Sequence, residues 1–204
     1  ILKLGLKGFQ LPWLLATQNN SIAAINNLRR IGSRRNGRKD ETHQIESRLG
    51  EQFEAKGFAV VKAYHPEIIN FEDPGEVDLI CCREDHLFIL EVKSTYIRKS
   101  EQDAWIHYTT TLRKAAQQLK RKHPAVLAAL TSDDSLRARL KLPNEINEIM
   151  VHSWIVDTSI EYDQIKIDGF LKISLEGLLI ILWNEQHFMR GIILENEKLY
   201  LNDF

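Results

Sequence analysis

Cysteine is scarce in this sequence of 204 residues, which contains two, Cys81 and Cys82, side by side in an apolar run. Adjacent cysteines suit neither a structural disulfide nor a Cys-x-x-Cys metal site. A small secreted domain stabilised by disulfides is therefore excluded as a class. A reducing, cytoplasmic setting is expected instead.

Long apolar runs and clustered histidines are also lacking. The most apolar stretch, near Leu175–Trp183, is too short to cross a bilayer and is interrupted by Glu176. The opening residues lack the features of a signal peptide, and the chain begins at Ile1 rather than Met, as a trimmed fragment would. The seven histidines form no compact ligand spacing. We therefore expect no membrane association and no histidine-based metal site.

Charge is nearly balanced over the whole chain but unevenly distributed along it. From Pro143 onward the chain has 11 acids and 4 bases, whereas the residues before it have 17 acids and 23 bases. Lys and Arg release counterions from a phosphate backbone, so the front portion is suited to nucleic acid. The candidate nucleic-acid-binding residues are Arg34, Arg35, Arg38, Lys39, Arg113, Lys114 and Lys120.

Two parts of the chain are predicted, an N-terminal helix with a basic linker (residues 1–40) and a domain with an acidic C-terminal extension (residues 41–204). Apolar spacing predicts a helix over Ser21–Arg30. The basic run after it contains Gly and Ser, which is typical of a flexible linker, either a nucleic-acid arm or a solvated connection. A final strand is predicted over Gly191–Leu201.

Within the domain, the order of elements predicts an α/β fold with a mixed central β-sheet flanked by helices. A first helix is capped by Asp40 or Thr42 and ends at Gly57. Pro124 is expected to interrupt a later helix that starts near Ala104, and Lys122 is among the basic residues of this helix that are expected to face solvent or phosphate. The remaining predicted elements are strands over Phe58–Tyr64, Val77–Cys82, Leu87–Val92, Ile149–Val156 and Gln164–Ile167, and a helix from Ser174 through Trp183.

The second and third of these strands bring acidic side chains together. If their hairpin turn is centred between Glu84 and Asp85, Asp78 faces Glu91 with the roots of the two side chains about 5 Å apart. Lys93 then shares the face of Glu91 because side chains alternate along a strand, and Glu76 shares that of Asp78. Two opposed carboxylates among apolar residues call for positive charge, which Lys93 and a hard divalent cation would supply. This combination suits phosphodiester hydrolysis.

The run from Pro74 to Ile80, followed by Glu91-Val92-Lys93, resembles the core motif of the PD-(D/E)XK nuclease superfamily, in its endonuclease-like and Holliday-junction-resolvase-like branches. The resemblance covers residues 41–122. The superfamily is named after a motif that begins with Pro-Asp. In this sequence Gly75-Glu76 stands at that place, before Val77-Asp78, a departure that other members share. The resemblance implies a restriction-endonuclease-like core.

The resemblance also implies a metal site and a set of catalytic residues. Glu46 lies eleven residues before Gly57-Phe58, as a helix glutamate does in several branches, although Glu51 or Glu54 could replace it. Gln118, or its neighbour Gln117, matches a frequent helix glutamine. The implied cofactor is Mg²⁺, for which Mn²⁺ could substitute. The implied metal ligands are Asp78, Glu91, Glu46 and the backbone of Val92, and the implied catalytic residues are Asp78, Glu91, Lys93, Glu46 and Gln118.

The sequence therefore predicts a Mg²⁺-dependent endonuclease or exonuclease that hydrolyses DNA, with RNA open as a substrate. Trp105 and Tyr108 could stack on bases, although core packing is the preferred interpretation for Trp105. One alternative is an inactive nuclease-like module that binds nucleic acid or a protein partner. Another is a part of a larger machine, such as a phage, transposon or defence protein. A homodimer is a further open partner, and an ordinary surface charge pattern is the simplest alternative for the acids.

Overall fold

The computed structural model describes residues 2–4, 7–9, 35–67, 73–95, 98, 100–142 and 149–183. The chain divides into two compact units, Ile1–Arg38 and Lys39–Phe204. In the first unit, β1 (Leu2–Leu4) and β2 (Lys7–Phe9) form an antiparallel pair that was not predicted. The helix predicted for Ser21–Arg30 and the strand predicted for Gly191–Leu201 lie outside the described residues.

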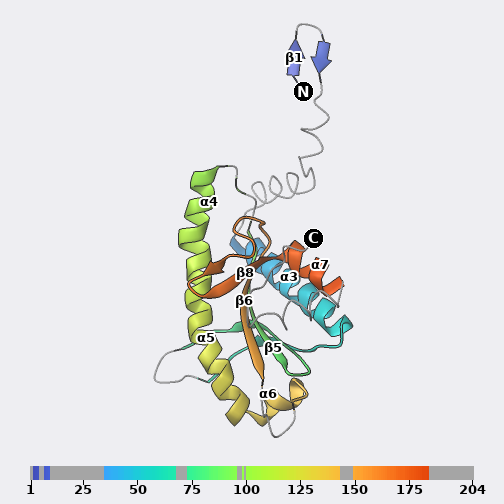
Figure 1. The fold of residues 1–204 in the computed structure, drawn as a ribbon, viewed down its shortest axis with the longest axis vertical. Helices are drawn as coiled ribbons and strands as arrows, with labels where there is room; N and C mark the ends of the chain where they lie inside the picture. The colour runs from blue at the N-terminus through green and yellow to red at the C-terminus, as the bar shows by residue number, and fades with distance from the viewer. Residues whose placement is uncertain are drawn as a thin grey trace. The chain divides into compact units, whose positions relative to one another are not determined.

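A six-stranded mixed sheet forms the centre of the second unit, with the order β3-β4-β5-β6-β8-β7 (Figure 1). Antiparallel pairs join β3, β4 and β5, and β7 with β8, whereas β5, β6 and β8 run parallel. This arrangement confirms the predicted α/β class with a mixed sheet. The strands are β3 (Ala59–Tyr64), β4 (Val77–Arg83), β5 (His86–Lys93), β6 (Met150–Asp157), β7 (Lys166–Ile167) and β8 (Phe170–Ser174).

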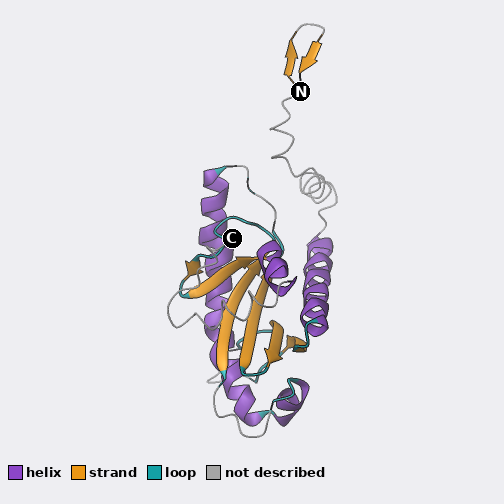
Figure 2. Cartoon of the chain, turned by 45° about the vertical axis from the view of Figure 1, so that its right-hand side comes forward, coloured by secondary structure: helices purple, strands orange, loops and turns teal. Residues whose placement is uncertain are grey.

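Helices cover both faces of the sheet (Figures 1 and 2). One face carries α3 (Arg35–Ala55) and α7 (Leu175–Trp183). The other carries a long helix made of α4 (Glu101–His107), a π-helical turn η1 (Tyr108–Leu112) and α5 (Arg113–Ser132), followed by α6 (Asp134–Arg139). Among the helices described, none has the length and apolar composition needed to cross a membrane.

Two hydrophobic cores result, one on each face, because β4 and β5 are buried on both sides. Leu79 and Leu90 pack in the core that contains Phe53 of α3. Ile80 and Ile89, one residue along each strand, pack in the core that contains Leu119 of α5. Burial on both faces explains the continuous apolar runs of these strands. The same alternation turns Asp78 and Glu91 toward the face covered by α5.

The C-terminal part of the predicted basic linker is helical. Because α3 begins at Arg35, the basic residues Arg35, Arg38 and Lys39 belong to a helix that starts ahead of the predicted caps. Arg and Lys favour helices almost as strongly as Ala. They extend a helix whose later turns are anchored by the buried Leu49 and Phe53.

Two further predictions fail around α5 and β8. The helix continues through Pro124 to Ser132. Pro124 is exposed, so the Lys120 carbonyl that loses its helix donor can reach water, while Leu119 and Val126 keep the apolar stripe continuous. Strand β8 was not predicted because the charged Lys172 breaks its short apolar run.

Candidate active site

The hairpin of β4 and β5 sets two carboxylates side by side at one edge of the sheet, where β4 begins and β5 ends. Its turn lies at Glu84 and Asp85, and the paired residues run from Arg83 opposite His86 to Leu79 opposite Leu90, which confirms the predicted register. The next step places Asp78 opposite Glu91. There Asp78 Oδ2 accepts a hydrogen bond of 2.7 Å from the backbone N–H of Val92. The Asp78 carboxylate is therefore fixed to the strand that carries Glu91.

Two lysines neutralise this carboxylate pair. Lys93, at the end of β5, donates from Nζ to Glu91 Oε1 and keeps 23% of its side chain exposed. Lys122, from α5, donates to Glu91 Oε2 and lies 3.5 Å from Asp78 Oδ1. The side chains of Lys122 and Glu91 are only 3% and 1% exposed. The cluster thus holds two acids and two bases, with Lys93 as the member nearest solvent.

Lys122 is a site residue that the sequence interpretation missed, since it assigned this lysine to the solvent-facing or phosphate-binding residues of the helix. Its position is nevertheless readable in retrospect, because Lys122 follows Leu119 by three residues and precedes Val126 by four. Residues at these spacings share one helix face, and both neighbours are buried. Glu76, expected near Asp78, instead pairs with His65 at 2.9 Å.

Burial shapes the titration of Asp78. Desolvation and, after it, the charge of Glu91 raise the pKa of the Asp78 carboxyl to about 6. The Lys122 ammonium, the Val92 N–H and Lys93 act in the opposite direction without cancelling this rise. Asp78 therefore changes its charge close to neutral pH, as groups at functional sites often do.

This shift predicts how Asp78→Asn changes stability in the presence of a chelator. The folded protein holds the Asp78 proton up to about pH 6, whereas an unfolded Asp ionises near 3.8. The contribution of the Asp78 proton to folding stability is therefore fully present below about pH 3.8 and is lost as the pH rises through about 6. Asn stays neutral throughout. We expect Asp78→Asn to gain about 2 kcal/mol relative to wild type between about pH 4 and about pH 8.

Urea unfolding across this pH range measures the difference between Asp78→Asn and wild type. The exposed Asp134, changed to Asn, serves as the matched control and should show no comparable trend. A stability difference for Asp78→Asn that stays constant with pH would contradict the assignment of a raised pKa.

Gln118 lies one turn before Lys122 in α5. Its side-chain Oε1 is buried and has no hydrogen-bond partner within the described part of the chain. Buried polar atoms are nearly always satisfied, so this oxygen is suited to accept a bond from a water, a substrate or a mobile side chain. Gln117, the alternative considered for this place, is exposed.

Glu46 occupies a different environment from the other expected ligands. It belongs to α3, which packs on the opposite face of the sheet from α5. Its carboxylate accepts a hydrogen bond of 3.1 Å from His43 Nδ1, one turn earlier in the same helix. The structure therefore brings together Asp78, Glu91 and Lys93 but pairs Glu46 elsewhere.

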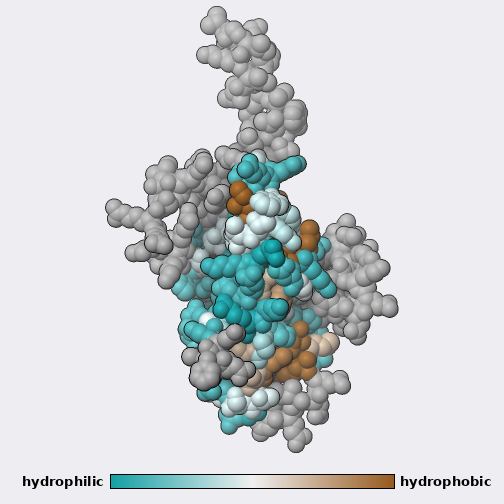
Figure 3. Space-filling view, turned by 90° about the vertical axis from the view of Figure 1, so that its left-hand side faces the viewer, coloured by the Kyte–Doolittle hydropathy of each residue, from teal (hydrophilic) through white to brown (hydrophobic). Residues whose placement is uncertain are grey.

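Basic residues line the outer surface of α5, which Figure 3 shows as a hydrophilic area over the helix. Lys114, Gln117, Gln118, Lys120 and Arg121 line an open pocket of about 430 Å³. A second pocket, of about 340 Å³, is lined by Arg113, Ala116, Gln117, Lys120, Asp168 and Phe170.

Trp105 is 62% exposed, so its predicted core packing is wrong. Arg34 lies outside the described residues, and for Arg35, Arg38 and Lys39 only the helical backbone is described.

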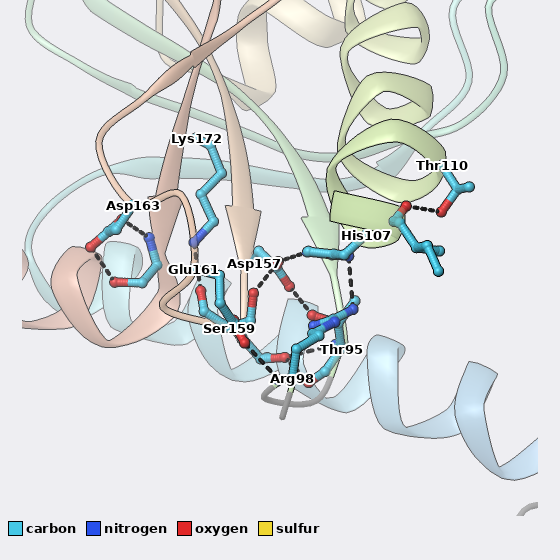
Figure 4. A network of polar contacts seen from close by, with 12 residues as sticks. Thr95, Arg98, His107, Thr110, Asp157, Ser159, Glu161, Asp163 and Lys172 are labelled. Carbon is cyan, nitrogen blue, oxygen red and sulfur yellow. Dashed lines mark hydrogen bonds and ion pairs between the residues drawn. The ribbon is translucent and has the colours of Figure 1, made fainter. Parts of the chain in front are cut away.

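A second polar cluster lies at the same sheet edge, where β6 ends beside β5 (Figure 4). Asp157, which is fully buried and pairs in register with Lys93, accepts hydrogen bonds from His107 Nε2 at 2.7 Å, from Ser159 at 2.6 Å and from Thr95. Arg98 donates to His107 Nδ1 at 2.7 Å. Burial alone would raise the pKa of Asp157, but these hydrogen bonds outweigh it and hold the pKa below its usual value.

The π-helical turn explains why His107 reaches Asp157. An α-helix turns about 100° per residue, so in an uninterrupted helix His107 would lie about 120° away from the inward-facing Leu119. The π-helical turn accommodates one extra residue, which brings His107 to within about 20° of that direction. His107 is therefore buried, and it bonds to Asp157 at the end of β6.

The donor set at Asp78 and Glu91 fits a divalent cation in part. Asp78 Oδ1 and Glu91 Oε2 both contact one atom, Lys122 Nζ, so two carboxylate oxygens already converge on a single positive charge. Carboxylate oxygen is the ligand that Mg²⁺ prefers. The described residues contain no group of three or more His, Cys, Asp or Glu side chains arranged around a metal position. A cation would therefore rely on two carboxylates together with backbone oxygen, water or substrate.

No protein-family model matches the chain, and no curated protein or solved structure does so either. The functional interpretation depends on the geometry of the site and on the sequence motif.

Proposed function

We propose that this chain is a metal-dependent nuclease of the PD-(D/E)XK type that hydrolyses phosphodiester bonds of DNA, acting in the cytoplasm. One observation carries the proposal: Asp78, Glu91 and Lys93 meet at one sheet edge, with the lysine at the solvent side of the acids. The basic surface of α5 supports it, because phosphates bind Lys and Arg. The exposed Trp105 offers a surface on which bases can stack.

The residues of the site would divide the work as follows. Asp78 and Glu91, with the Val92 backbone, would hold Mg²⁺, which on binding polarises a phosphate and lowers the pKa of water. The Val92 N–H fixes the orientation of the Asp78 carboxylate. Lys93 is held by Glu91 and can orient the attacking water or stabilise the negative charge that develops on the phosphate. Gln118 can accept a hydrogen bond from a water or the substrate through its buried Oε1.

A second candidate function, binding without cleavage, is favoured by the arrangement of Lys122. Its ammonium already balances the acids, and Glu46 is paired with His43 instead of completing the site. Such a module would retain the basic surface of α5 and bind nucleic acid within a larger assembly.

Incubation with supercoiled plasmid, linear duplex, single-stranded DNA and RNA separates the two functions. Each substrate is tested with Mg²⁺, Mn²⁺ or EDTA. We expect cleavage of DNA with either cation and none with EDTA. Binding in a mobility-shift assay without cleavage would support the second function, and cleavage that persists in EDTA would contradict a metal-dependent mechanism.

A further inference from the structure

We propose that Lys122 is an internal counter-ion that competes with a divalent cation for the Asp78–Glu91 pair. Cation binding then requires the Lys122 ammonium to leave the position between the two carboxylates. This inference rests on the proposed metal-dependent function and concerns how the same site is controlled.

All four oxygens of the two carboxylates already have donors or cations beside them. Asp78 Oδ2 accepts from the Val92 N–H, and Glu91 Oε1 accepts from Lys93. The two remaining oxygens, Asp78 Oδ1 and Glu91 Oε2, share Lys122 Nζ. A cation that used both remaining oxygens would need the point that this ammonium occupies.

The charges in the cluster favour exchange over addition. Two carboxylates and two ammonium groups are already balanced, and the side chains of Glu91 and Lys122 are almost fully buried. Two more positive charges added to a neutral buried cluster would be poorly compensated. Departure of Lys122 leaves the carboxylates with excess negative charge, which the cation then neutralises.

The displaced ammonium has an acceptor within reach on its own helix. Gln118 precedes Lys122 by four residues, so the two side chains lie on the same face of α5. The buried Oε1 of Gln118 has no partner among the described residues. Lys122 can therefore move from the carboxylates to Gln118 without losing every hydrogen bond, which makes α5 a built-in sensor of the cation.

The test measures Mn²⁺ binding by electron paramagnetic resonance at about pH 8, where Asp78 is ionised. Wild type can bind the cation only in the molecules whose Lys122 has left the carboxylates. If these are about a tenth or fewer of the metal-free molecules, Lys122→Met should bind Mn²⁺ at least about tenfold more tightly than wild type. Lys93→Met is the matched control, because it removes a charge from the same Glu91 without vacating the shared point. Lys122→Gln, which keeps a donor for Glu91, covers the case in which the Met variant does not fold.

A gain specific to the Lys122 variants supports the proposal. An equal gain in Lys93→Met would show a general charge effect and overturn it. Equal Mn²⁺ affinity in wild type and Lys122→Gln would overturn it while leaving the proposed nuclease intact. The Glu91→Gln variant shows which Mn²⁺ binding belongs to this site. If neither wild type nor any Lys122 variant binds Mn²⁺ in a way that Glu91→Gln abolishes, the metal-dependent function itself is overturned.

A measurement on the unaltered protein gives an independent readout. The buried Lys122 ammonium should give a slowly exchanging ¹⁵Nζ signal in NMR spectra. Added Mg²⁺ should shift or remove this signal, and Lys122→Gln identifies it by its absence. An unchanged Lys122 signal at saturating Mg²⁺ would contradict displacement.

Discussion

Lys93→Met should lower the rate of phosphodiester cleavage by about three orders of magnitude, within the range that proton-transferring and charge-stabilising groups contribute. Lys93 is the lysine of the cluster that retains appreciable exposure, so it is the one that a phosphate can reach without rearrangement. Met keeps most of the length of the side chain and removes only the ammonium. In the protein without metal, Glu91 keeps its bond to Lys122, which preserves the packing of the site.

Single-turnover cleavage of plasmid at saturating Mg²⁺ is the measurement for Lys93→Met, with circular dichroism to establish folding. Lys62→Met is the matched control, because Lys62 also projects from a strand of this sheet but bonds to the backbone carbonyl of Ser47. The control should cleave at the wild-type rate. A folded Lys93→Met protein with unchanged cleavage would remove Lys93 from the mechanism.

The central hairpin could be predicted because its register follows from a short turn. Once Glu84 and Asp85 form the turn, side-chain alternation leaves no freedom in which residues face each other. The flanking apolar residues also reveal that Asp78 and Glu91 lie within buried strands. The juxtaposition of the two acids could therefore be predicted from the sequence.

The contributions of α4 and α5 could not be predicted in the same way. Lys122 was assigned to solvent or phosphate because a lysine among Lys120 and Arg121 resembles an exposed surface, although its spacing to Leu119 places it inward. The direction of His107 depends on the π-helical turn, which has no sequence signature at this position. Helix prediction assumes a constant turn per residue, and that assumption fails where the helix contains an extra residue.

The end of β6 was predicted one residue too early, and that residue is Asp157. A charged residue after Ile155 and Val156 resembles the start of a loop. In the folded protein its charge is satisfied by Ser159, two residues later, and by His107 and Thr95, which are distant in the sequence. The two distant partners are visible only after folding, so the sequence did not place Asp157 in a buried cluster.

Asp157→Ala should destabilise the protein by about 3–5 kcal/mol, because each buried donor left without its charged acceptor costs about 1–3 kcal/mol. The substitution leaves the buried His107 Nε2 and the Ser159 hydroxyl without their acceptor. Thr95 loses its acceptor as well, and Thr95 lies two residues after Lys93. The free energy of unfolding from urea titration measures this effect.

The exposed Asp134, changed to Ala, is the matched control for Asp157→Ala and should change stability by less than about 1 kcal/mol. The effect of Asp157 also depends on pH in a definite direction. Because its folded pKa is lowered, its stabilisation is present above the unfolded pKa of an Asp and is lost as the pH falls through the folded value. The difference between wild type and Asp157→Ala should therefore shrink in acid. A difference that grows in acid would mean that burial, rather than the hydrogen bonds from His107, Ser159 and Thr95, determines the pKa of Asp157. The cluster would then destabilise the end of the sheet that carries Lys93.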